Sequence, residues 1–349
     1  MVEVTSGRGG LVISTAIKEI VAGHDLPPDD VEAVMDTILE GEASAAQIAA
    51  FVVALRMKGE SANEIAAAAR SLRKHCGAIR PKVDGPLLDT CGTGGDGLHT
   101  FNISTAAAIV AAASGVAVAK HGNRAVSSKA GSADVLEALG VRIDLAPPQV
   151  VQCIEEVGIG FLFAPSHHAA MRHAAPVRRE LGVRTLFNLL GPLSNPASAT
   201  HQLVGVYDPT RLEQLAQALG SLGLTAAWVV HGEGGLDEVS PAGPTSVAQW
   251  ANGKVSTLEV RPGDFGLSQV PVEELAGGDA RRNAEIVRTV LDGQQGPARV
   301  AVLLNAAAAL RVTGFADDLR VATERAAHAI DSGGAKRTLE RWAHFTQSA

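Results

Sequence analysis

The sequence predicts an α/β fold: a large domain with a central, mostly parallel sheet flanked by helices, and a small all-α domain. Two observations carry this prediction. Residues 10–75 show helical periodicity without a strand signal, whereas short apolar runs and helical segments alternate from Pro86 onward. Such alternation is typical of a largely parallel sheet. A chain of 349 residues is long enough for two domains.

Four helices are expected in the N-terminal part. Leu11–Val21 has apolar residues at helical spacing, and Pro27-Pro28-Asp29-Asp30 marks the start of a second helix that either aspartate can cap. Two capping boxes, Ser44-x-x-Gln47 and Ser61-x-x-Glu64, open the third and fourth helices. The Ala- and Val-rich segment 45–55 suggests close packing on several sides, which a dimer interface or an ordinary domain core explains equally well.

After a linker over Gly77–Gly85, strands and helices are expected in turn. The expected strands cover 86–91, 116–119, 160–164, 202–207, 226–231 and a hairpin over 247–258 that turns at Asn252-Gly253. The expected helices cover 105–113, 132–139, 149–157, 211–222, 279–291, 298–312, 317–331 and 335–345.

The stretch from Asp89 to Thr105 predicts a strand, a glycine loop and a helix start. Four glycines within six residues let the backbone approach a ligand closely. Asn102 or Ser104 offers an N-cap, and the free N–H groups and dipole of a helix start attract anions. The pattern is neither the dinucleotide fingerprint nor the P-loop. On its own, a tight turn without a ligand explains it as well as a phosphate site does.

A second donor-rich stretch, Lys120–Asp134, follows the next expected strand. It contains three cations, two adjacent hydroxyls and two glycines, which suit a polyphosphate. For the charges alone, a solvated basic loop is the simpler explanation. Two such loops after consecutive strands favour a ligand with more than one phosphate.

A pair of acids, Asp237-Glu238, follows the expected strand 226–231 and the loop Gly232–Gly235. Ligands of open α/β sheets bind beyond the carboxyl ends of strands, and two carboxylates there suit Mg²⁺. Adjacent side chains point apart on regular structure, so both can reach metal only from an irregular loop, which the glycines supply. For an isolated pair, two solvated acids remain the simpler explanation.

Composition and charge exclude several classes of protein. The net charge is −7, from 30 Lys and Arg against 37 Asp and Glu, which argues against a general nucleic-acid binder. Cys76, Cys91 and Cys153 have no metal-binding spacing, which indicates a reducing cytosol. The N-terminal residues lack the pattern of a signal peptide, and no apolar run predicts a membrane span.

Together these stretches resemble the anthranilate phosphoribosyltransferases of tryptophan biosynthesis. The similarity covers nearly the whole chain in order, through 89–97, 102–105, 120–128, 174–182, 187–193 and 235–240. It implies that residues 1–80 and the helical segment 166–190 form the small α domain. Residues 81–165 and 191–349 would then form the large domain, which binds phosphoribosyl pyrophosphate.

The resemblance implies a pentosyl-transferring glycosyltransferase. The reaction is the Mg²⁺-dependent transfer of 5-phosphoribosyl from phosphoribosyl pyrophosphate to the amino group of anthranilate. Its products are N-(5-phosphoribosyl)anthranilate and pyrophosphate. An aromatic amine is already neutral at pH 7, so no dedicated acid or base residue is expected.

The resemblance also implies the residues of the site. Ser104, Asp237 and Glu238 would hold two Mg²⁺ ions per subunit. Arg178 would bind the anthranilate carboxylate through its guanidinium fork, helped by Gly92, Asn123 and His121. The residues expected to bind phosphoribosyl pyrophosphate are Gly92, Gly95, Asp96, Thr100, Asn102, Ile103, Ser104, Thr105, Lys120, His121, Gly122, Asn123, Arg124, Ala125, Val126, Ser127, Ser128 and Ser132.

Further expectations from the resemblance are a cytoplasmic location and a homodimer formed through the small α domain. The expected partners are the two small-molecule substrates, without nucleic acid or membrane. The sequence does not indicate whether an anthranilate synthase amidotransferase binds.

Two alternatives compete with this interpretation. A pyrimidine nucleoside phosphorylase of the same architecture would show Lys-His-Ser-Thr-Gly-Gly at the first loop, where Asp-Thr-Cys-Gly-Thr-Gly-Gly stands. A non-catalytic, nucleic-acid-binding relative is opposed by the acidic net charge and by the presence of Ser104, Arg178, Asp237 and Glu238.

Overall fold

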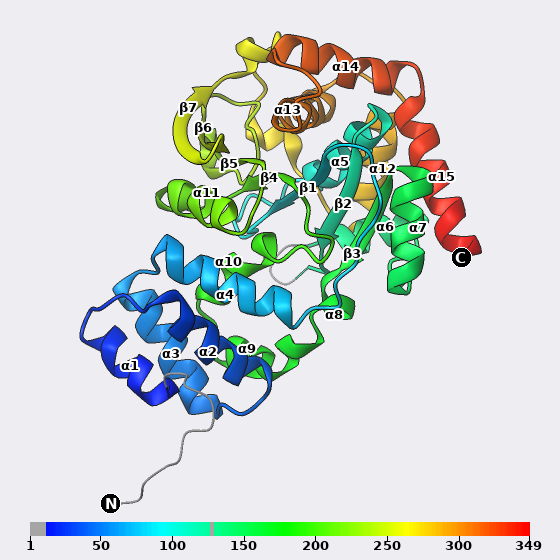
Figure 1. Ribbon diagram of the computed structural model, residues 1–349. Helices are drawn as coiled ribbons and strands as arrows, with labels where there is room; N and C mark the ends of the chain where they lie inside the picture. The colour runs from blue at the N-terminus through cyan, green and yellow to red at the C-terminus, as the bar shows by residue number, and fades with distance from the viewer. Residues whose placement is uncertain (1–11, 126–128) are drawn as a thin grey trace, which may run out of the picture. The chain divides into compact units, whose positions relative to one another are not determined.

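The computed structural model describes residues 12–125 and 129–349 (Figure 1). The chain forms two compact units. The first ends at Cys76 and resumes over His168–Ser194, and the second comprises Gly77–His167 and Asn195–Ala349. Val126, Ser127 and Ser128, which are expected to bind phosphate, lie outside the described residues.

The described part of the first unit is helical throughout, as its apolar periodicity predicts. Both capping boxes are confirmed, because the Ser44 and Ser61 hydroxyls each accept the N–H of the third residue after them at 3.3 Å. The expected cap of the second helix is wrong: Pro27 occupies the N-cap position, and the two aspartates lie in the first turn. The elements are α1 (Ile13–Val21), α2 (Pro28–Leu39), α3 (Ala45–Lys58), α4 (Ala62–Lys74), η1 (Ala169–His173), α9 (Ala175–Leu181) and α10 (Leu186–Leu193).

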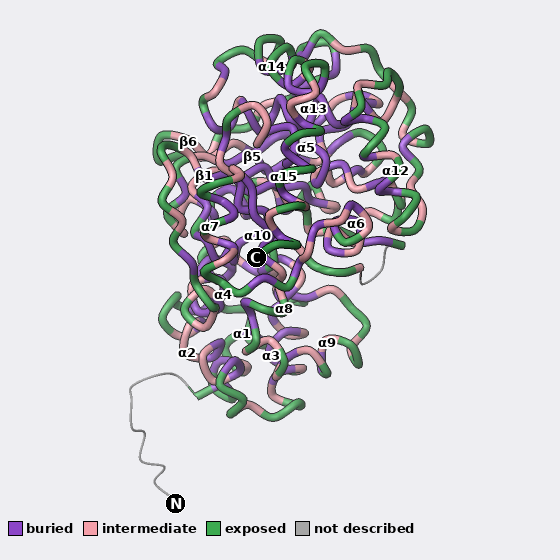
Figure 2. Tube along the Cα trace, turned by 90° about the vertical axis from the view of Figure 1, so that its right-hand side faces the viewer, coloured by how far each residue is buried: buried purple, intermediate pink, exposed green. Residues whose placement is uncertain are grey.

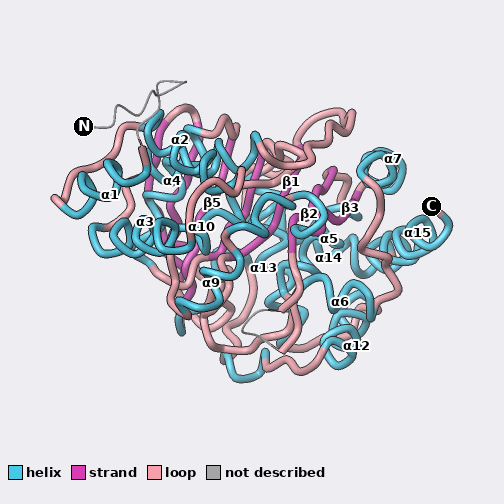
Figure 3. The backbone as a smooth tube through the Cα atoms, turned by 90° about the horizontal axis from the view of Figure 1, so that it is seen from below, coloured by secondary structure: helices cyan, strands magenta, loops and turns pink. Residues whose placement is uncertain are grey.

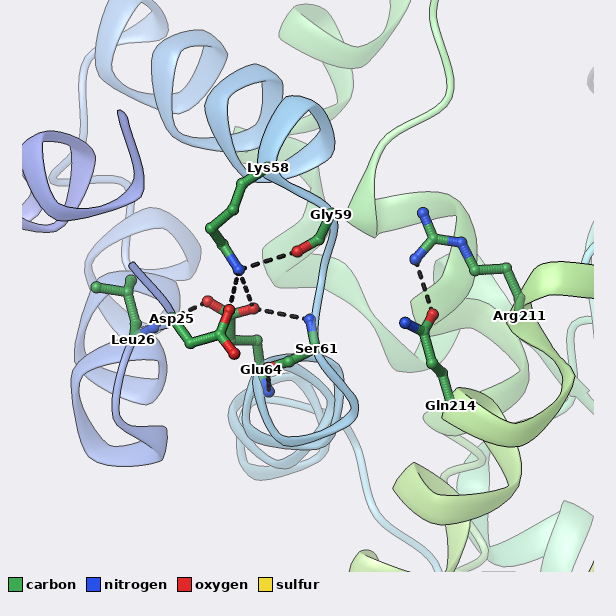
Figure 4. A network of polar contacts seen from close by, with 8 residues as sticks. All are labelled: Asp25, Leu26, Lys58, Gly59, Ser61, Glu64, Arg211 and Gln214. Carbon is green, nitrogen blue, oxygen red and sulfur yellow. Dashed lines mark hydrogen bonds and ion pairs between the residues drawn. The ribbon is translucent and has the colours of Figure 1, made fainter. Parts of the chain in front are cut away.

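A buried ion pair joins α3, α4 and the segment before α2 (Figure 4). Glu64, which is fully buried, accepts the N–H groups of Leu26 at 3.0 Å and Ser61 at 2.8 Å, and binds the Lys58 ammonium at 2.9 Å. Lys58 also pairs with Asp25. Burial lowers the pKa of Lys58, but its bonds to Asp25 and Glu64 raise that pKa overall. Both oxygens of the buried carboxylate are therefore satisfied.

The second unit is built on one seven-stranded sheet in the order β3-β2-β1-β4-β5-β6-β7. Figure 3 draws the strands of this sheet in magenta. β1 to β5 run parallel, and β6 and β7 form an antiparallel hairpin at one edge. The mostly parallel sheet and the hairpin turn at Asn252-Gly253 are confirmed. The strands are β1 (Leu87–Gly92), β2 (Ala117–Gly122), β3 (Ile159–Phe163), β4 (His201–Gly205), β5 (Ala226–Gly232), β6 (Thr245–Ala251) and β7 (Lys254–Val260).

Helices cover both faces of this sheet. Leu88 and Val118 pack into one core cluster with α5 and α13, whereas their neighbours Leu87 and Ala119 pack into another with α7. This division follows from the period of two along a strand. Buried residues gather around α5 and α13 (Figure 2). The helices are α5 (Ile103–Ala113), α6 (Ser132–Ala138), α7 (Pro147–Val157), α8 (Ala164–His167), α11 (Leu212–Ser221), α12 (Ala280–Leu291), α13 (Pro297–Val312), α14 (Leu319–Asp331) and α15 (Gly334–Ser348).

A helix that crosses a bilayer needs about 20 mostly apolar residues. In the two described ranges of the chain, no helix combines the length and the apolar character that crossing a membrane requires.

Replacing Glu64 by alanine should lower the free energy of unfolding of the full chain by about 3–5 kcal/mol. The change leaves the Lys58 charge poorly compensated in a buried place and deprives two backbone N–H groups of their acceptor. Ser44→Ala is the control, because it removes only an exposed cap and should cost about 1 kcal/mol. Urea unfolding followed by circular dichroism measures both, and equal losses would contradict the prediction.

Candidate active site

Four neighbouring parallel strands end in glycine at the same edge of the sheet: Gly92, Gly122, Gly205 and Gly232. At two of them a Cβ atom would collide with Asp237. It would lie 2.6 Å from Asp237 Oδ2 at Gly92, and 1.6 Å from the Asp237 carbonyl oxygen at Gly205. These glycines therefore let the acidic segment lie directly on the carboxyl ends of β1 and β4, where ligands of such sheets bind.

The glycine loop after β1 is shaped to donate hydrogen bonds. The Thr93 N–H donates to the Gly205 carbonyl oxygen at 2.9 Å, which ties the loop to β4. Gly94 and Gly95 have φ values of 65° and 80°, in the left-handed region that favours glycine. The Gly94 N–H donates to Asp237 Oδ2 at 2.9 Å. At least one backbone N–H of the loop, that of Gly94, thus points at an acidic side chain.

The N-terminus of α5 is capped by a side chain that lies far away in the sequence. Asn102 is the N-cap residue, but its side chain accepts from Asn283 at 3.0 Å and donates to the Ala130 carbonyl oxygen at 3.3 Å. The Ser104 N–H donates instead to Glu238 Oε1 at 3.0 Å. Asn102, one of the two predicted N-cap residues, does occupy the N-cap position. The prediction that its own side chain caps the helix is wrong, because Glu238 accepts the free N–H of Ser104.

Lys120 is a buried cation next to this helix start. It is 1% exposed, donates to the Thr90 carbonyl oxygen at 2.6 Å and lies 3.5 Å from Ser104 Oγ. Burial lowers its pKa, and the Asp89 carboxylate opposes that effect. Asp89 is fully buried as well, and it accepts the His121 N–H at 3.1 Å. Lys120 thus supplies positive charge from below the loops and is not part of a solvated surface.

Asp134 holds the base of the loop between β2 and α6, the second donor-rich stretch of the sequence. Its Oδ2 accepts the N–H groups of Ala125 at 3.0 Å and Gly131 at 2.8 Å, and its Oδ1 accepts from the Arg124 guanidinium at 2.9 Å. Arg124 also binds Glu137 at 2.9 Å. The guanidinium, which is expected to contact phosphate, is therefore already shared by two carboxylates and holds the loop against α6.

Other expected phosphate-binding residues differ in exposure. Gly92, Gly95 and Asn123 are exposed, and Asp96, Thr100, Gly122 and Ser132 are half-buried. Ile103 and Thr105 are buried in the core. Their N–H groups donate to backbone carbonyl oxygens of the turn at the start of α5. The exposed loop residues are thus the ones that a ligand can reach in this conformation.

Asp237 and Glu238 lie next to each other on the loop after β5. Burial, with a further contribution from Asp96, raises the pKa of Asp237 to about 7. Burial and the neighbouring Asp237 raise the pKa of Glu238 to about 8. Their oxygens, together with the Ser104 hydroxyl, are hard ligands of the kind Mg²⁺ prefers. Within the described residues, no three His, Cys, Asp or Glu side chains form a ready metal cluster.

Arg178 belongs to the first unit, on α9. Its guanidinium lies 5.7 Å from the centre of the Phe187 ring, and burial lowers its pKa. Arg179 is exposed. Of the two neighbours, Arg178 alone is thus partly desolvated beside an aromatic ring, an environment in which an organic carboxylate binds a guanidinium strongly.

Sequence reasoning missed four residues that shape this edge of the sheet: Gly205, Asp134, Asn283 and Asn305. Asn283 donates to Asn102 and accepts the Gly278 N–H at 2.7 Å. Asn305 binds the backbone next to Glu238. Of these four, only Asn305 could have been singled out from the sequence, because it is the one polar residue in the apolar run 301–310.

Comparison with known proteins places these features in a family. The glycosyl transferase family matches with its helical bundle domain over residues 14–76 and with its a/b domain over residues 84–336. The anthranilate phosphoribosyltransferases of Symbiobacterium thermophilum and Myxococcus xanthus are 55% and 53% identical to this chain. These matches cover 95% and 94% of this chain, and 96% and 97% of those proteins.

Solved structures agree. That of anthranilate phosphoribosyltransferase from Thermus thermophilus has a TM-score of 0.91 at 46% identity, covering 95% of this chain and 99% of its own. That of the Saccharomyces cerevisiae enzyme in complex with PRPP and Mg has a TM-score of 0.89 at 30% identity, covering 97% and 98%. With relatives this similar along almost its whole length, the chain belongs to the anthranilate phosphoribosyltransferase family.

Proposed function

We propose that this chain transfers the 5-phosphoribosyl group of phosphoribosyl pyrophosphate to the amino group of anthranilate, with Mg²⁺, in tryptophan biosynthesis. One observation carries the proposal from the structure. The N–H groups of Gly94 and Ser104, on the glycine loop and at the start of α5, converge with Asp237 and Glu238 above buried Lys120. This arrangement supports a site at which carboxylate oxygens hold a metal next to the glycine loop and a buried cation.

The two loops bind phosphoribosyl pyrophosphate in this proposal. Exposed backbone at Gly92, Gly95 and Asn123 supplies donors, and the buried ammonium of Lys120 supplies charge that water does not screen. Asp96, Thr100, Asn102, Ile103, Ser104, Thr105, His121, Gly122, Arg124, Ala125, Val126, Ser127, Ser128 and Ser132 complete the set that the family resemblance implies.

Asp237, Glu238 and Ser104 hold magnesium in this proposal, with two ions per subunit. When bound, Mg²⁺ neutralises the charge that develops on the departing pyrophosphate. The protein would contribute oxygen ligands on an irregular loop, and the repulsion between the two adjacent carboxylates would be relieved by a bound divalent cation.

Arg178 binds the anthranilate carboxylate, and Gly92, Asn123 and His121 orient the aromatic acid. The amine needs no base to become a nucleophile, so catalysis rests on positioning and electrostatics. Covalent catalysis by Cys91 is disfavoured, because desolvation and the nearby Asp89 raise the pKa of its thiol well above the ordinary value. The three scattered cysteines, Cys76, Cys91 and Cys153, take part in no disulfide within the described residues, which supports a reducing, cytoplasmic location.

Anthranilate fluorescence tests the function directly. In the presence of phosphoribosyl pyrophosphate and Mg²⁺, the purified chain should remove the fluorescence of anthranilate. A parallel assay with a pyrimidine nucleoside and inorganic phosphate, the substrates of the competing phosphorylase, should show no turnover. The opposite pair of results would overturn the proposal.

Arg178→Ala should raise the KM for anthranilate about ten- to a hundredfold, because a hydrogen bond to a charged group contributes roughly 1.5–3 kcal/mol. The KM for phosphoribosyl pyrophosphate should change little. Exposed Arg179 is the matched control, and Arg179→Ala should be nearly silent in steady-state kinetics. A reversed pattern would assign the carboxylate to Arg179, and two silent variants would place its recognition elsewhere.

The metal-free protein should lose stability as the pH rises. The pKa of Asp237 is about 7 and that of Glu238 about 8 in the folded chain, above the values near 4 of unfolded carboxyls. The folded state therefore retains protons that the unfolded chain releases, and this stabilising contribution is lost between about pH 4 and about pH 8.

Thermal unfolding in the presence of a chelator measures this slope. Asp237→Asn and Glu238→Gln should flatten the decline of Tm with pH, and both should increase the Mg²⁺ concentration that half-maximal activity requires. A slope that neither variant changes would contradict the assignment of the raised pKa values.

The first unit also carries the proposed homodimer face. α1 and α3 line a cavity of about 400 Å³ whose walls include Ile17, Ala50 and Val53. Val21 and Met57 also line it, and they are 73% and 83% exposed. Large exposed apolar side chains around an apolar groove are typical of an interface between proteins. A second copy of this chain is the occupant that the family resemblance implies.

Light scattering at micromolar concentration should give the mass of a dimer. Met57→Glu should shift the mass to that of a monomer, because a charge would be buried in the interface. Val321→Glu on α14 is the control, since Val321 is an exposed apolar residue of the second unit and should leave the mass unchanged. A monomeric wild-type chain would refute the dimer.

A further inference from the structure

A fully buried asparagine stands in the middle of α13. Asn305 has no exposed surface, and the neighbouring residues 301–304 and 306–310 are all buried Ala, Val or Leu. An amide in such surroundings costs about 1–3 kcal/mol unless its polar atoms find partners. The partners of Asn305 therefore indicate what the side chain does.

Asn305 forms hydrogen bonds with both backbone polar groups of Val239, its N–H and its carbonyl oxygen. Its Oδ1 accepts the Val239 N–H at 2.9 Å, and its Nδ2 donates to the Val239 carbonyl oxygen at 3.0 Å. Nδ2 also donates to the Ala301 carbonyl oxygen at 2.9 Å. Because a backbone N–H can only donate and a carbonyl oxygen can only accept, these partners fix the orientation of the amide. Val239 is buried and directly follows Glu238.

The other side of the same segment lies directly against β4. A Cβ atom at Gly205 would lie 1.6 Å from the Asp237 carbonyl oxygen, so the acidic segment touches the end of the strand. Just before it, the Gly232 N–H donates to the Leu236 carbonyl oxygen at 2.8 Å. The backbone of residues 236–239 is thus held from three directions, and the two carboxylates extend from it towards Gly94 and Ser104.

Two adjacent carboxylates repel each other, so a loose loop would relax by moving them apart and would have to reassemble around a cation. A clamp on the backbone removes that freedom before the cation arrives. Residues that orient metal ligands from the second layer typically change metal affinity about 10–100-fold. Asn305 is suitably placed for this task, because these hydrogen bonds go to backbone atoms and to neither carboxylate.

We propose that Asn305 is a positioning residue for the divalent-cation site: by clamping Val239 it fixes the backbone from which Asp237 and Glu238 extend. The inference rests on the metal role of these two carboxylates under the proposed function. It predicts that loss of the clamp weakens cation binding more than it weakens the fold or the recognition of anthranilate.

The test uses the full-length protein and Mn²⁺ as the probe, with inorganic pyrophosphate present. Titration followed by the electron paramagnetic resonance signal of free Mn²⁺ gives the affinity without any need for turnover. Asn305→Ala should weaken Mn²⁺ binding about tenfold or more. In steady-state kinetics it should raise the Mg²⁺ requirement and leave the KM for anthranilate within about twofold.

Thr313→Ala is the matched control for general damage to α13. Thr313 is buried and donates to the carbonyl oxygens of Ala309 and Leu310 in the last turn, away from residues 236–239. This variant should lower Tm without changing the affinity for Mn²⁺. Equal weakening of Mn²⁺ binding by both variants would reduce Asn305 to a residue of the core and overturn the proposal.

Asn305→Leu is the variant of similar volume and decides the matter if Asn305→Ala does not fold. It fills the space of the amide but offers Val239 neither an acceptor nor a donor, so Mn²⁺ binding should again weaken. A folded variant of either kind with wild-type affinity overturns the proposal. A failure of the proposed function looks different: the wild-type chain would bind Mn²⁺ but leave anthranilate unconsumed, and Asn305 would still be tested by the Mn²⁺ titration.

Discussion

Two hydrogen bonds from backbone amides to adjacent carboxylates hold the functional edge of the sheet together. Gly94 donates to Asp237 across 143 positions of sequence, and Ser104 donates to Glu238 across 134. Such distant partners meet only because the sheet order sets β1 beside β4 and β4 beside β5. The parallel topology is therefore a condition for the site, and helices on both faces stabilise that topology.

Two buried residues of opposite charge, Lys120 and Asp89, lie beneath the loops that follow β1 and β2. Burial lowers the pKa of Lys120 and raises that of Asp89, and each charge opposes the effect of burial on the other. Asp89 further accepts from Asn195 at 2.8 Å and Gln202 at 3.2 Å. A cation can therefore remain below the glycine loop because a hydrogen-bonded carboxylate lies close to it.

Local patterns predicted most of the fold, because periodicity, capping boxes and the Asn252-Gly253 turn act over a few residues. Contacts between distant residues could not be predicted in this way. Nothing near Ser104 indicates that Glu238 caps α5, and nothing near Arg124 indicates that its charge is shared with Glu137. Asn305 was visible as a polar interruption of an apolar run, but its partner lies 66 positions away.

The close approach at Gly205 also has a consequence for comparing chains of this fold. A side chain of any size at position 205 is incompatible with the observed path of residues 236–239, because the first carbon atom would overlap the Asp237 carbonyl oxygen. A protein that carries a larger residue at the end of the same strand must route its acidic segment differently. This one backbone position can therefore sort members of the fold by the path of the loop that carries the acidic pair, even where the pair itself is present.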